Sequence, residues 1–525
     1  MENRENILKG AIFWLLLATF FKGVIWSGIV PLWHFPDEQA HFAQLQNLAE
    51  GVKLNKEGST SEEIYFSEKI LGTERDERGN NRFTFHPQYN LAYSKGFLGF
   101  EELKIKNFSL EARKKMAISE ATGYSPLYYL GGAIFYRAVY PASLFVRVNI
   151  VRLYSVLLTV LTIWLVYKIG LLVFKKKLWA LSLAVLVSFQ PMFTSTMSGV
   201  NSDVLFNFFF TLFIWASLLV LKKQNLRTVG LLLLSLLVGL LTKPQMFIAL
   251  CLSIIPLGLV FWKGRLRYQK KLSFKRLYLL IGIFALLSLS FFFGRTFQIA
   301  GFILAGKESI KIGLFEHLIW TLRHTIAEVI PWYWGVFKWL GVVLPRWVNQ
   351  VQMRLLGLTV LGLVIYLIKI IRQRRLKARD WQIGFLGLTA LAYFLAVTLW
   401  NWQFRIAYGF PFGVQGRYFF PAIVSHMAII LVGLTSLVPK KFVKWIAMTL
   451  SAWWITLSFI GLWVVVNAYY QIWPLQAFWW QISQYKPFWF KAEWWFLWLM
   501  LFFISLLSLL VTLFKEFRRY EAKET

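Results

Sequence analysis

The sequence predicts an all-α polytopic integral membrane protein with about 12 transmembrane helices of roughly 20 residues each. Hydrophobic residues make up 58% of the 525 residues, and the mean hydropathy is +0.55. Lysines and arginines gather in short strips between long apolar runs, a pattern typical of the loops of membrane proteins. Soluble globular domains do not combine these features. We therefore expect residues 1–525 to form a single membrane domain.

The apolar runs follow one another along the chain, with two features that affect the count of spans. Lys243-Pro244 interrupts one continuous apolar stretch, because proline cannot continue a helix. Residues 126–140 are apolar enough for a further span, but counting them would reverse the orientation of every later loop. We expect a helix in the outer interface there instead. The predicted spans are centred near residues 21, 161, 188, 212, 235, 254, 285, 361, 391, 428, 455 and 504.

The basic strips predict which side of the membrane each loop faces. Positively charged loops stay in the cytoplasm, and every strip falls on that side when both termini are inside. Residues 33–149 and 295–350 then form two long extracytoplasmic loops, and residues 515–525 form a short cytoplasmic tail. We therefore expect an active site on these loops to face outward. The strips are Lys175–Lys177, Lys222–Lys223, Lys263–Arg276, Lys369–Arg379, Lys440–Lys441 and Lys515–Lys523.

Charge and cysteine content argue against several classes of protein. The formal net charge of +32 would suit a nucleic-acid partner, but the strips between spans account for it, so no nucleic acid is expected. The single cysteine, Cys251, rules out an intramolecular disulfide. None of the 25 acidic residues lies at the middle of a predicted span, and fourteen lie between Asp37 and Glu120. Since ion-coupled transporters usually need carboxylates at mid-membrane depth, we expect the ionisable chemistry at the outer face.

The segment Phe35–Phe42, directly after the first predicted span, is the main candidate site. It contains Asp37, Glu38 and His41, and acids at a membrane boundary are costly unless they are used. The apolar spacing predicts a helix that ends at Gly51. Asp37 and His41 are four residues apart and so lie on one face of it. An acidic helix cap is the simpler interpretation of Asp37 alone, but the three ionisable residues together favour an active site.

Other polar residues are predicted to converge on the same face. Asn201 and Asp203 lie in the short outer loop between the third and fourth spans. Lys243 and Arg417 lie outside, against the positive-inside trend, which suggests an anionic ligand, although snorkelling to lipid phosphates would explain either one. The remaining candidates are Tyr418, Arg405, His317 and His324, the histidines lying in a segment that also carries Trp332, Trp334, Trp339 and Trp347.

Several of these blocks resemble one superfamily of glycosyltransferases. Pro36-Asp37-Glu38-x-x-His41-Phe42 looks like the signature of a bacterial branch of predicted membrane proteins within the GT-C superfamily, which includes protein mannosyltransferases, aminoarabinose transferases and oligosaccharyltransferases. The resemblance implies a protein of the bacterial cytoplasmic membrane, a polyprenyl-phosphate sugar donor, an acceptor on the outer face and an essential acid in the first outer loop. The later blocks, in the expected order, are Tyr124–Tyr129, Asn201–Asp203 and Gln415–Pro421.

The chemistry of sugar transfer suits these residues. A carboxylate must accept the proton of the attacking hydroxyl, and positive charge must stabilise the departing phosphate. We assign Asp37 as the base and Glu38 as its partner or substitute. One base and a phosphate leaving group predict inversion at the anomeric carbon. The predicted substrate-binding residues are His41, Asn201, Asp203, Lys243, His317, His324, Arg405, Arg417 and Tyr418, with Lys243 and Arg417 as the first candidates for the phosphate.

A metal site is an alternative use of the same acids. Asp37, Glu38 and Asp203, together with His41, offer hard ligands that would suit Mg²⁺ or Mn²⁺. Such a site requires the loop 201–203 to approach the first outer helix. No other cofactor is indicated.

The expected function is therefore transfer of a sugar from a polyprenyl phosphate to a glycan, lipid or protein acceptor, in contact with membrane lipids. Two alternatives stay open. A lipid or polysaccharide transporter would also be polytopic and rich in interfacial tryptophan, but it predicts mid-span charges or repeated halves. A non-catalytic assembly component of cell-envelope glycan synthesis would tolerate the loss of Asp37.

Overall fold

A computed structural model describes residues 2–52, 58–76, 79–94, 100–119, 125–266, 312–374 and 376–521. Several sequence-based expectations lie outside these residues. They are the span near residue 285, residues 295–311 of the second outer loop, most of the basic strip Lys263–Arg276, Tyr124 of the second motif, and the last four residues of the tail.

Long apolar helices form a bundle, as the sequence predicts for an integral membrane protein. Eight helices in the described residues are long and apolar enough to cross a membrane. A helix rises 1.5 Å per residue, so about 20 residues cross the roughly 30 Å hydrocarbon layer. The spans are Gly10–Ile29 within α1 (Glu2–Ile29), α6 (Leu144–Phe174), α9 (Asp203–Lys222), α15 (Arg346–Gln373), α16 (Ala378–Tyr408), Gly416–Leu437 (η4, Gly416–Ala422, with α17, Ile423–Leu437), Lys440–Tyr469 (η5, Lys440–Phe442, with α18, Val443–Tyr469) and Trp494–Tyr520 within α20 (Trp494–Glu521).

The predicted span near residue 188 is broken. Helices α7 (Lys177–Ser188) and α8 (Pro191–Met197) meet at an angle of 65°. Pro191 occupies the first turn of α8, and the side chain of Gln190 accepts a hydrogen bond from the backbone of Phe193. This is an ordinary start for a new helix, because proline is tolerated only in the first turn. Counted as one span, the pair raises the number in the described residues to nine.

The predicted break at Lys243-Pro244 is present. It separates α10 (Leu226–Leu240) from η2 (Pro244–Met246) and α11 (Phe247–Leu266). The apolar helical segments on either side, Leu226–Leu240 and Pro244–Val260, have fewer than 18 residues each, which is about 27 Å or less. The expected total of 12 full-length spans is therefore not reached by the described residues.

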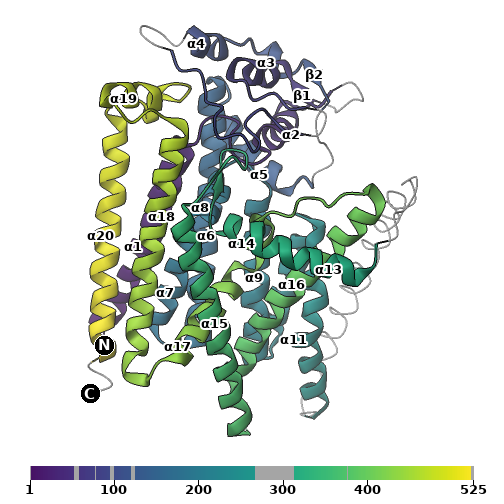
Figure 1. The fold of residues 1–525 in the computed structure, drawn as a ribbon, viewed down its shortest axis with the longest axis vertical. Coiled ribbons are helices and arrows are strands. Elements are labelled where there is room, and N and C mark those ends of the chain that lie inside the picture. The colour runs from purple at the N-terminus through teal and green to yellow at the C-terminus, as the bar shows by residue number, and fades with distance from the viewer. Residues whose placement is uncertain are drawn as a thin grey trace.

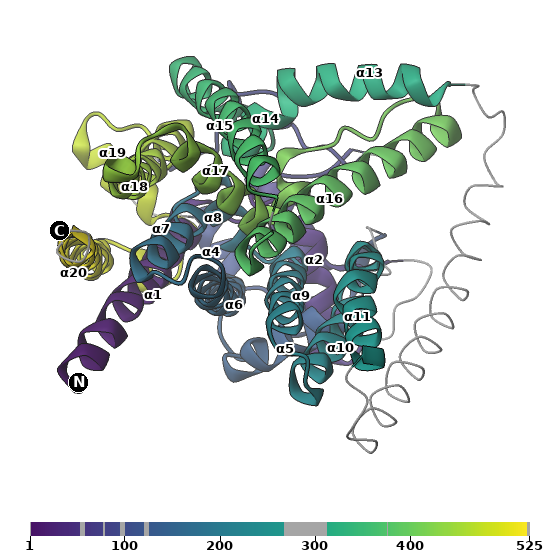
Figure 2. The same cartoon turned by 90° about the horizontal axis from the view of Figure 1, so that it is seen from below.

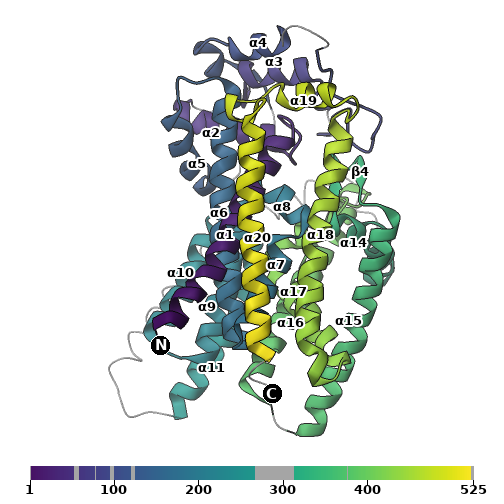
Figure 3. The ribbon, with the colours of Figure 1, turned by 90° about the vertical axis from the view of Figure 1, so that its left-hand side faces the viewer.

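A cap of short elements covers one end of the bundle, and both chain termini lie at the other end (Figures 1 and 3). Helix α5 has only 12 residues, about 18 Å, so the predicted interfacial helix at 126–140 is too short to be a span. It packs against α2 and α6. The cap comprises α2 (Glu38–Glu50), β1 (Thr60–Ser61), α3 (Glu62–Leu71), α4 (Phe100–Lys106), η1 (Glu111–Arg113), β2 (Met116–Ile118) and α5 (Leu127–Ala138), with β1 and β2 paired antiparallel.

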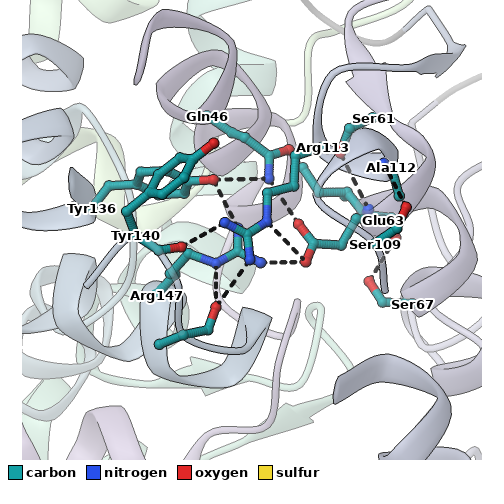
Figure 4. A network of polar contacts seen from close by, with 12 residues as sticks. Gln46, Ser61, Glu63, Ser67, Ser109, Ala112, Arg113, Tyr136, Tyr140 and Arg147 are labelled. Carbon is teal, nitrogen blue, oxygen red and sulfur yellow. Dashed lines mark hydrogen bonds and ion pairs between the residues drawn. The ribbon is translucent and has the colours of Figure 1, made fainter. Parts of the chain in front are cut away.

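A buried ionic network fastens the cap to the bundle (Figure 4). Glu63 of α3 forms an ion pair with Arg147 of α6 and lies 3.9 Å from Arg113. Gln46 of α2 donates to Glu63 at 2.9 Å, and Arg147 donates to the hydroxyl of Tyr136 on α5 at 2.8 Å. Because a buried charge is stable only when it is paired and hydrogen-bonded, this network fixes α2, α3 and α5 against α6.

The remaining short elements lie between the cap end and the middle of the long helices (Figures 1 and 3). Seen along the bundle, α13 lies side-on, whereas α6 and α20 are viewed nearly end-on, so α13 runs across the direction of the long helices (Figure 2). The elements are α13 (Leu314–His324), η3 (Thr325–Val329), α14 (Ile330–Trp334), the antiparallel strands β3 (Val336–Phe337) and β4 (Val342–Val343), α19 (Leu475–Ser483) and η6 (Phe488–Phe490).

Candidate active site

A cavity of about 290 Å³ lies between the cap and the bundle. The turn between α1 and α2, the cap segment 79–84, the broken helix α8, the segment 336–340, the start of η4 and the end of α18 all contribute to its wall. The lining residues are Val30, His34, Pro36, Asp37, Gly79, Asn80, Thr84, Met192, Ser195, Val336, Phe337, Lys338, Trp339, Leu340, Phe412, Gln415, Arg417, Tyr418, Val465 and Tyr469.

Asp37 lies on the wall of this cavity between two arginines. Its Oδ1 is 3.2 Å from Nη2 of Arg75, and its Oδ2 is 3.0 Å from Nη2 of Arg417. Burial raises the pKa of Asp37, but the charges of Arg417 and Arg75 outweigh that effect and hold the pKa well below its usual range. The carboxylate is therefore ionised and neutralised by its neighbours.

The structure does not support the interpretation of Asp37 as a simple helix cap. Helix α2 begins at Glu38, and the side chain of Asp37 makes no capping hydrogen bond. The backbone of Asp37 is left-handed, with φ 57°, and Trp33 at the other end of the turn has φ 64°. Such conformations carry strain in residues other than glycine and cluster at functional sites. The turn between α1 and α2 thus directs Asp37 to the two arginines rather than to its own helix.

Glu38 occupies a different environment from its neighbour and does not line the cavity. It is fully buried, and its carboxylate accepts two hydrogen bonds from Arg152, at 2.8 Å and 2.5 Å. The backbone amides of Trp33 and Val200 donate to the same carboxylate at 3.1 Å and 3.2 Å. Its oxygens are therefore occupied, and Glu38 joins the turn, α6 and the loop before α9 rather than partnering Asp37.

The second arginine neighbour was not foreseen from the sequence. Arg75 lies in the cap, where its backbone pairs with Asn81 and its guanidinium lies 5.2 Å from the ring of Trp339. Arg417 is placed by η4: its Nε donates to Gln415 at 2.9 Å. A Cβ on Gly416 would collide with the backbone of Tyr333, so this glycine allows the two backbones to approach closely. Because Tyr418 also lines the cavity, η4 delivers two of the predicted residues to it.

A second ion pair, Asp203 with Lys243, lies beside the first but outside the cavity wall. Asn201 connects the two sites: its Nδ2 donates to the carbonyl of Pro36 at 3.3 Å, and its Oδ1 accepts from the backbone of Asp203 at 2.8 Å. The predicted approach of the 201–203 loop to the first outer helix is therefore observed. Lys243, however, forms its ion pair with Asp203 and does not line the cavity.

His41 lies between the two ion pairs. Its Nδ1 is 2.7 Å from the hydroxyl of Tyr129. Burial and the charge of Lys243 lower the pKa of His41 to about 3, against the opposing charges of Asp37 and Asp203. The imidazole is therefore neutral at ordinary pH and is held on α2 by a residue of α5.

Three predicted phosphate candidates lie elsewhere. His317 and His324 are on α13 and Arg405 is on α16, and none of them lines the cavity. Both histidines stack on Trp320, with ring centroids at 5.7 Å and 4.9 Å, and the guanidinium of Arg405 is 5.5 Å from the same ring. These residues form a separate aromatic cluster, because α13 runs across the bundle and meets α16 instead of the α1–α2 turn.

The three carboxylates suggested for a metal site are paired with four different cationic side chains. Asp37 is held by Arg75 and Arg417, Glu38 by Arg152, and Asp203 by Lys243. Among the described residues, no three histidine, cysteine, aspartate or glutamate side chains are grouped so that they could hold a metal ion. The predicted Mg²⁺ or Mn²⁺ site does not fit these residues.

Sequence reasoning also missed His34 and Lys338, which line the cavity. Burial lowers the pKa of Lys338 to about 8, while its ammonium donates to the carbonyls of Pro87 and Ala468 and to Oδ1 of Asn90, at 2.9, 3.0 and 2.8 Å. Lys338 lies in the predicted second outer loop, against the positive-inside trend. The signal that singled out Lys243 and Arg417 would have found it too.

Solved structures similar to this chain include two of oligosaccharyltransferases from Archaeoglobus fulgidus. One is in complex with an inhibitory peptide and a dolichol-phosphate (13% identity, TM-score 0.41, covering 86% of this chain and 56% of that one). The other is the apo form (13% identity, TM-score 0.40, covering 90% of this chain and 56% of that one). The chain thus spans about half the length of these proteins.

Among curated proteins, none matches this chain. A protein family described as "Predicted membrane protein (DUF2142)" matches residues 20–426. That range includes the α1–α2 turn, the 201–203 loop, Lys243, the segment 336–340 and Arg417, and so most of the cavity wall. The chain belongs to this family of membrane proteins.

Proposed function

We propose that this protein is a GT-C type glycosyltransferase that moves a sugar from a polyprenyl phosphate to an acceptor hydroxyl, with Asp37 as the general base. One observation carries the proposal: a strained turn at the end of the first span places Asp37 on a cavity wall between Arg75 and Arg417. A carboxylate beside two guanidinium groups supplies both the base and the positive charge that such a transfer requires.

The ion pairs suggest how the donor would prepare the base. The phosphodiester of a polyprenyl-phosphate sugar is an anion, and guanidinium groups bind phosphate oxygens through paired hydrogen bonds. Arg417 and Arg75 are positioned to exchange Asp37 for this phosphate. Asp37 then loses its counter-charges, its pKa rises, and it becomes a better proton acceptor.

The reaction then balances as a single displacement. The acceptor oxygen bonds to the anomeric carbon, the bond between that carbon and the phosphate oxygen breaks, and the hydroxyl proton passes to Asp37. The polyprenyl phosphate takes the electron pair and departs against Arg417. Attack from the side opposite to the leaving group inverts the anomeric centre.

The neighbouring residues have positioning roles in this proposal. Glu38 and Arg152 hold the turn that carries Asp37. The Asp203–Lys243 pair and Asn201 hold the 201–203 loop against Pro36, and His41 packs between the two sites. The cap end of the bundle, with the described parts of the two outer loops, faces out of the bacterial cytoplasmic membrane, because the described basic strips and the described ends of the chain belong to the opposite end.

The test is the conservative substitution Asp37→Asn in purified protein reconstituted in liposomes. The assay follows transfer or hydrolysis of the sugar from radiolabelled undecaprenyl-phosphate glucose, mannose or galactose, and it measures binding of undecaprenyl phosphate separately. Loss of the general base should lower the rate by about 10²–10⁴-fold while the lipid phosphate still binds. Asp380→Asn is the matched control, because Asp380 accepts from Tyr366 and Lys377 at the α15–α16 connection. Transfer by Asp37→Asn at the wild-type rate would overturn the assignment and favour a transporter or an assembly component.

A further inference from the structure

Two side chains on the cavity wall have buried polar atoms without a hydrogen-bond partner. They are His34, at both ring nitrogens, and Tyr469, at its hydroxyl. Each residue is 4% exposed, and their rings meet edge to face with centroids 5.0 Å apart. No other residue that lines this cavity has such an atom among those the structure describes.

Unpaired polar atoms at these two buried positions lower the stability of the fold, and a phenylalanine at either position would avoid that loss. A buried donor or acceptor that gives up water without a new partner destabilises the fold. Native proteins therefore pair nearly all such groups, and the exceptions call for an explanation. A ligand in the cavity that pairs with these atoms would explain why they are polar. A half-turn of the imidazole about its Cβ–Cγ bond exchanges carbon and nitrogen positions, so the ring that lines the cavity can present a nitrogen to that ligand.

The two groups are suited to an uncharged hydroxyl. Burial, with the charges of Lys338, Arg152 and Arg82, lowers the pKa of His34 to about 3. The imidazole is thus neutral at ordinary pH and offers one donor and one acceptor, as the tyrosine hydroxyl does. Phe337 and Trp339 also line the cavity, and aromatic walls suit the flat apolar faces of a sugar ring.

Size and charge narrow the ligand further. A volume of about 290 Å³ is at the lower limit of the roughly 300–1,000 Å³ typical of small-molecule sites, which suits a single ring and not a chain of sugars. Arg417 and Lys338 on the wall face a single carboxylate, Asp37. This surplus of positive charge disfavours a ring that carries an amino group.

We infer that His34 and Tyr469 form the sugar subsite of the donor, where they bind hydroxyls of one uncharged hexose ring while Arg417 binds the phosphate. The inference rests on the proposed function, since it assumes a lipid-phosphate sugar. It adds that the transferred group is neutral, and that recognition of the ring is separate from recognition of the phosphate.

The test compares lipid phosphates with and without a sugar. Quenching of tryptophan fluorescence in the full-length protein in detergent gives affinities for undecaprenyl phosphate, its glucosyl, mannosyl and galactosyl derivatives, and its 4-amino-4-deoxyarabinosyl derivative. The wild type should bind at least one neutral hexosyl lipid more tightly than the bare lipid phosphate. It should bind the amino-sugar lipid no more tightly than the bare lipid phosphate.

Two isosteric variants then assign the subsite. Tyr469→Phe and His34→Phe should each reduce the advantage of the hexosyl lipid by about fivefold, the usual value of one hydrogen bond. The affinity for bare undecaprenyl phosphate should stay within about twofold of the wild type. Neither variant should melt at a lower temperature, because each removes unpaired polar atoms. The matched control Tyr366→Phe, at the Asp380 contact, should keep the full advantage.

The outcomes separate the two proposals. If the wild type binds bare undecaprenyl phosphate but no hexosyl lipid more tightly, or if both variants keep the full advantage, the sugar subsite is refuted and the phosphate site stands. Preference for the amino sugar also refutes it. Failure to bind any lipid phosphate refutes the proposed function and the subsite with it. If His34→Phe misfolds, Tyr469→Phe, which removes a single oxygen, decides alone.

Discussion

Substituting Glu38 by glutamine should make this protein less stable to unfolding, without a direct effect on the sugar-transfer reaction. Glu38 is fully buried and holds Arg152 through both oxygens. Glutamine keeps one acceptor oxygen but turns an amide group toward a guanidinium, and it leaves the charge of Arg152 without compensation. Removing one partner of a buried ion pair costs about 3–5 kcal/mol. We expect a loss of that size in the free energy of unfolding.

Intrinsic fluorescence of the 26 tryptophans reports thermal unfolding in detergent. The melting temperature of Glu38→Gln should fall clearly, and that of Asp37→Asn should fall by much less, because the Asp37 side chain keeps 35% of its surface exposed and its ion pairs are partly screened. The double variant Glu38→Gln/Arg152→Gln should recover part of the loss, since no unpaired charge remains.

The opposite pattern would refute this reasoning. If Glu38→Gln melts with the wild type and yet loses sugar transfer, the carboxylate acts in the reaction and not in the fold. The catalytic role would then move by one residue, and Asp37→Asn would be the variant that retains activity.

Further predictions concern charge and topology. Arg417→Lys should weaken binding of undecaprenyl phosphate by about tenfold or more, because the planar fork is lost; unchanged affinity would leave Arg417 as an interfacial residue. The pKa of Lys338 is about 8, so lipid-phosphate affinity should fall as the pH rises through 8, and Lys338→Met should remove that dependence. The pKa of Asp37 is held below its ordinary 3.8, so its ion pairs should stabilise the fold fully above about pH 4 and lose this effect as the pH falls further. In Asp37→Asn, the melting temperature should therefore depend less on pH in that acidic range. In a Cys251→Ala background, a cysteine at Asn80 should react with membrane-impermeant reagents in intact cells and one at Lys441 should not; the reverse would place Asp37 in the cytoplasm.

The membrane fold was predictable because its signals are local. An apolar run of roughly 20 residues identifies a helix without knowledge of its partners, and α1, α6 and α9 appear where expected. The break at Pro191 was missed because α7 and α8 together read as one apolar run. The helix near 235 has only 15 residues for the opposite reason, since the break at Pro244 divides one apolar run into α10 and α11.

The site was predictable in part. Arg417 was found because it violates the positive-inside trend, and it does meet Asp37. Arg75 was missed because it lies among many charged residues of the first outer loop, where one arginine does not differ from the others. His317, His324 and Arg405 lie away from the cavity, because the direction of α13 depends on tertiary packing that no local pattern encodes.

The two adjacent acids show why a motif alone does not assign roles. Neighbouring side chains at the start of a helix point in different directions, so Asp37 and Glu38 cannot both face one cavity. The left-handed backbone at Asp37 turns its carboxylate toward Arg75 and Arg417, and Glu38 enters the protein interior and binds Arg152. Arg152 also donates to the carbonyls of Ser27, Val30 and Pro31, so the buried acid fixes the end of the first span and the turn that follows. The strain at Asp37 can persist only because this contact over-determines the turn. Glu38 thus supports the function that its neighbour is proposed to perform, and the motif needs both acids for different physical reasons.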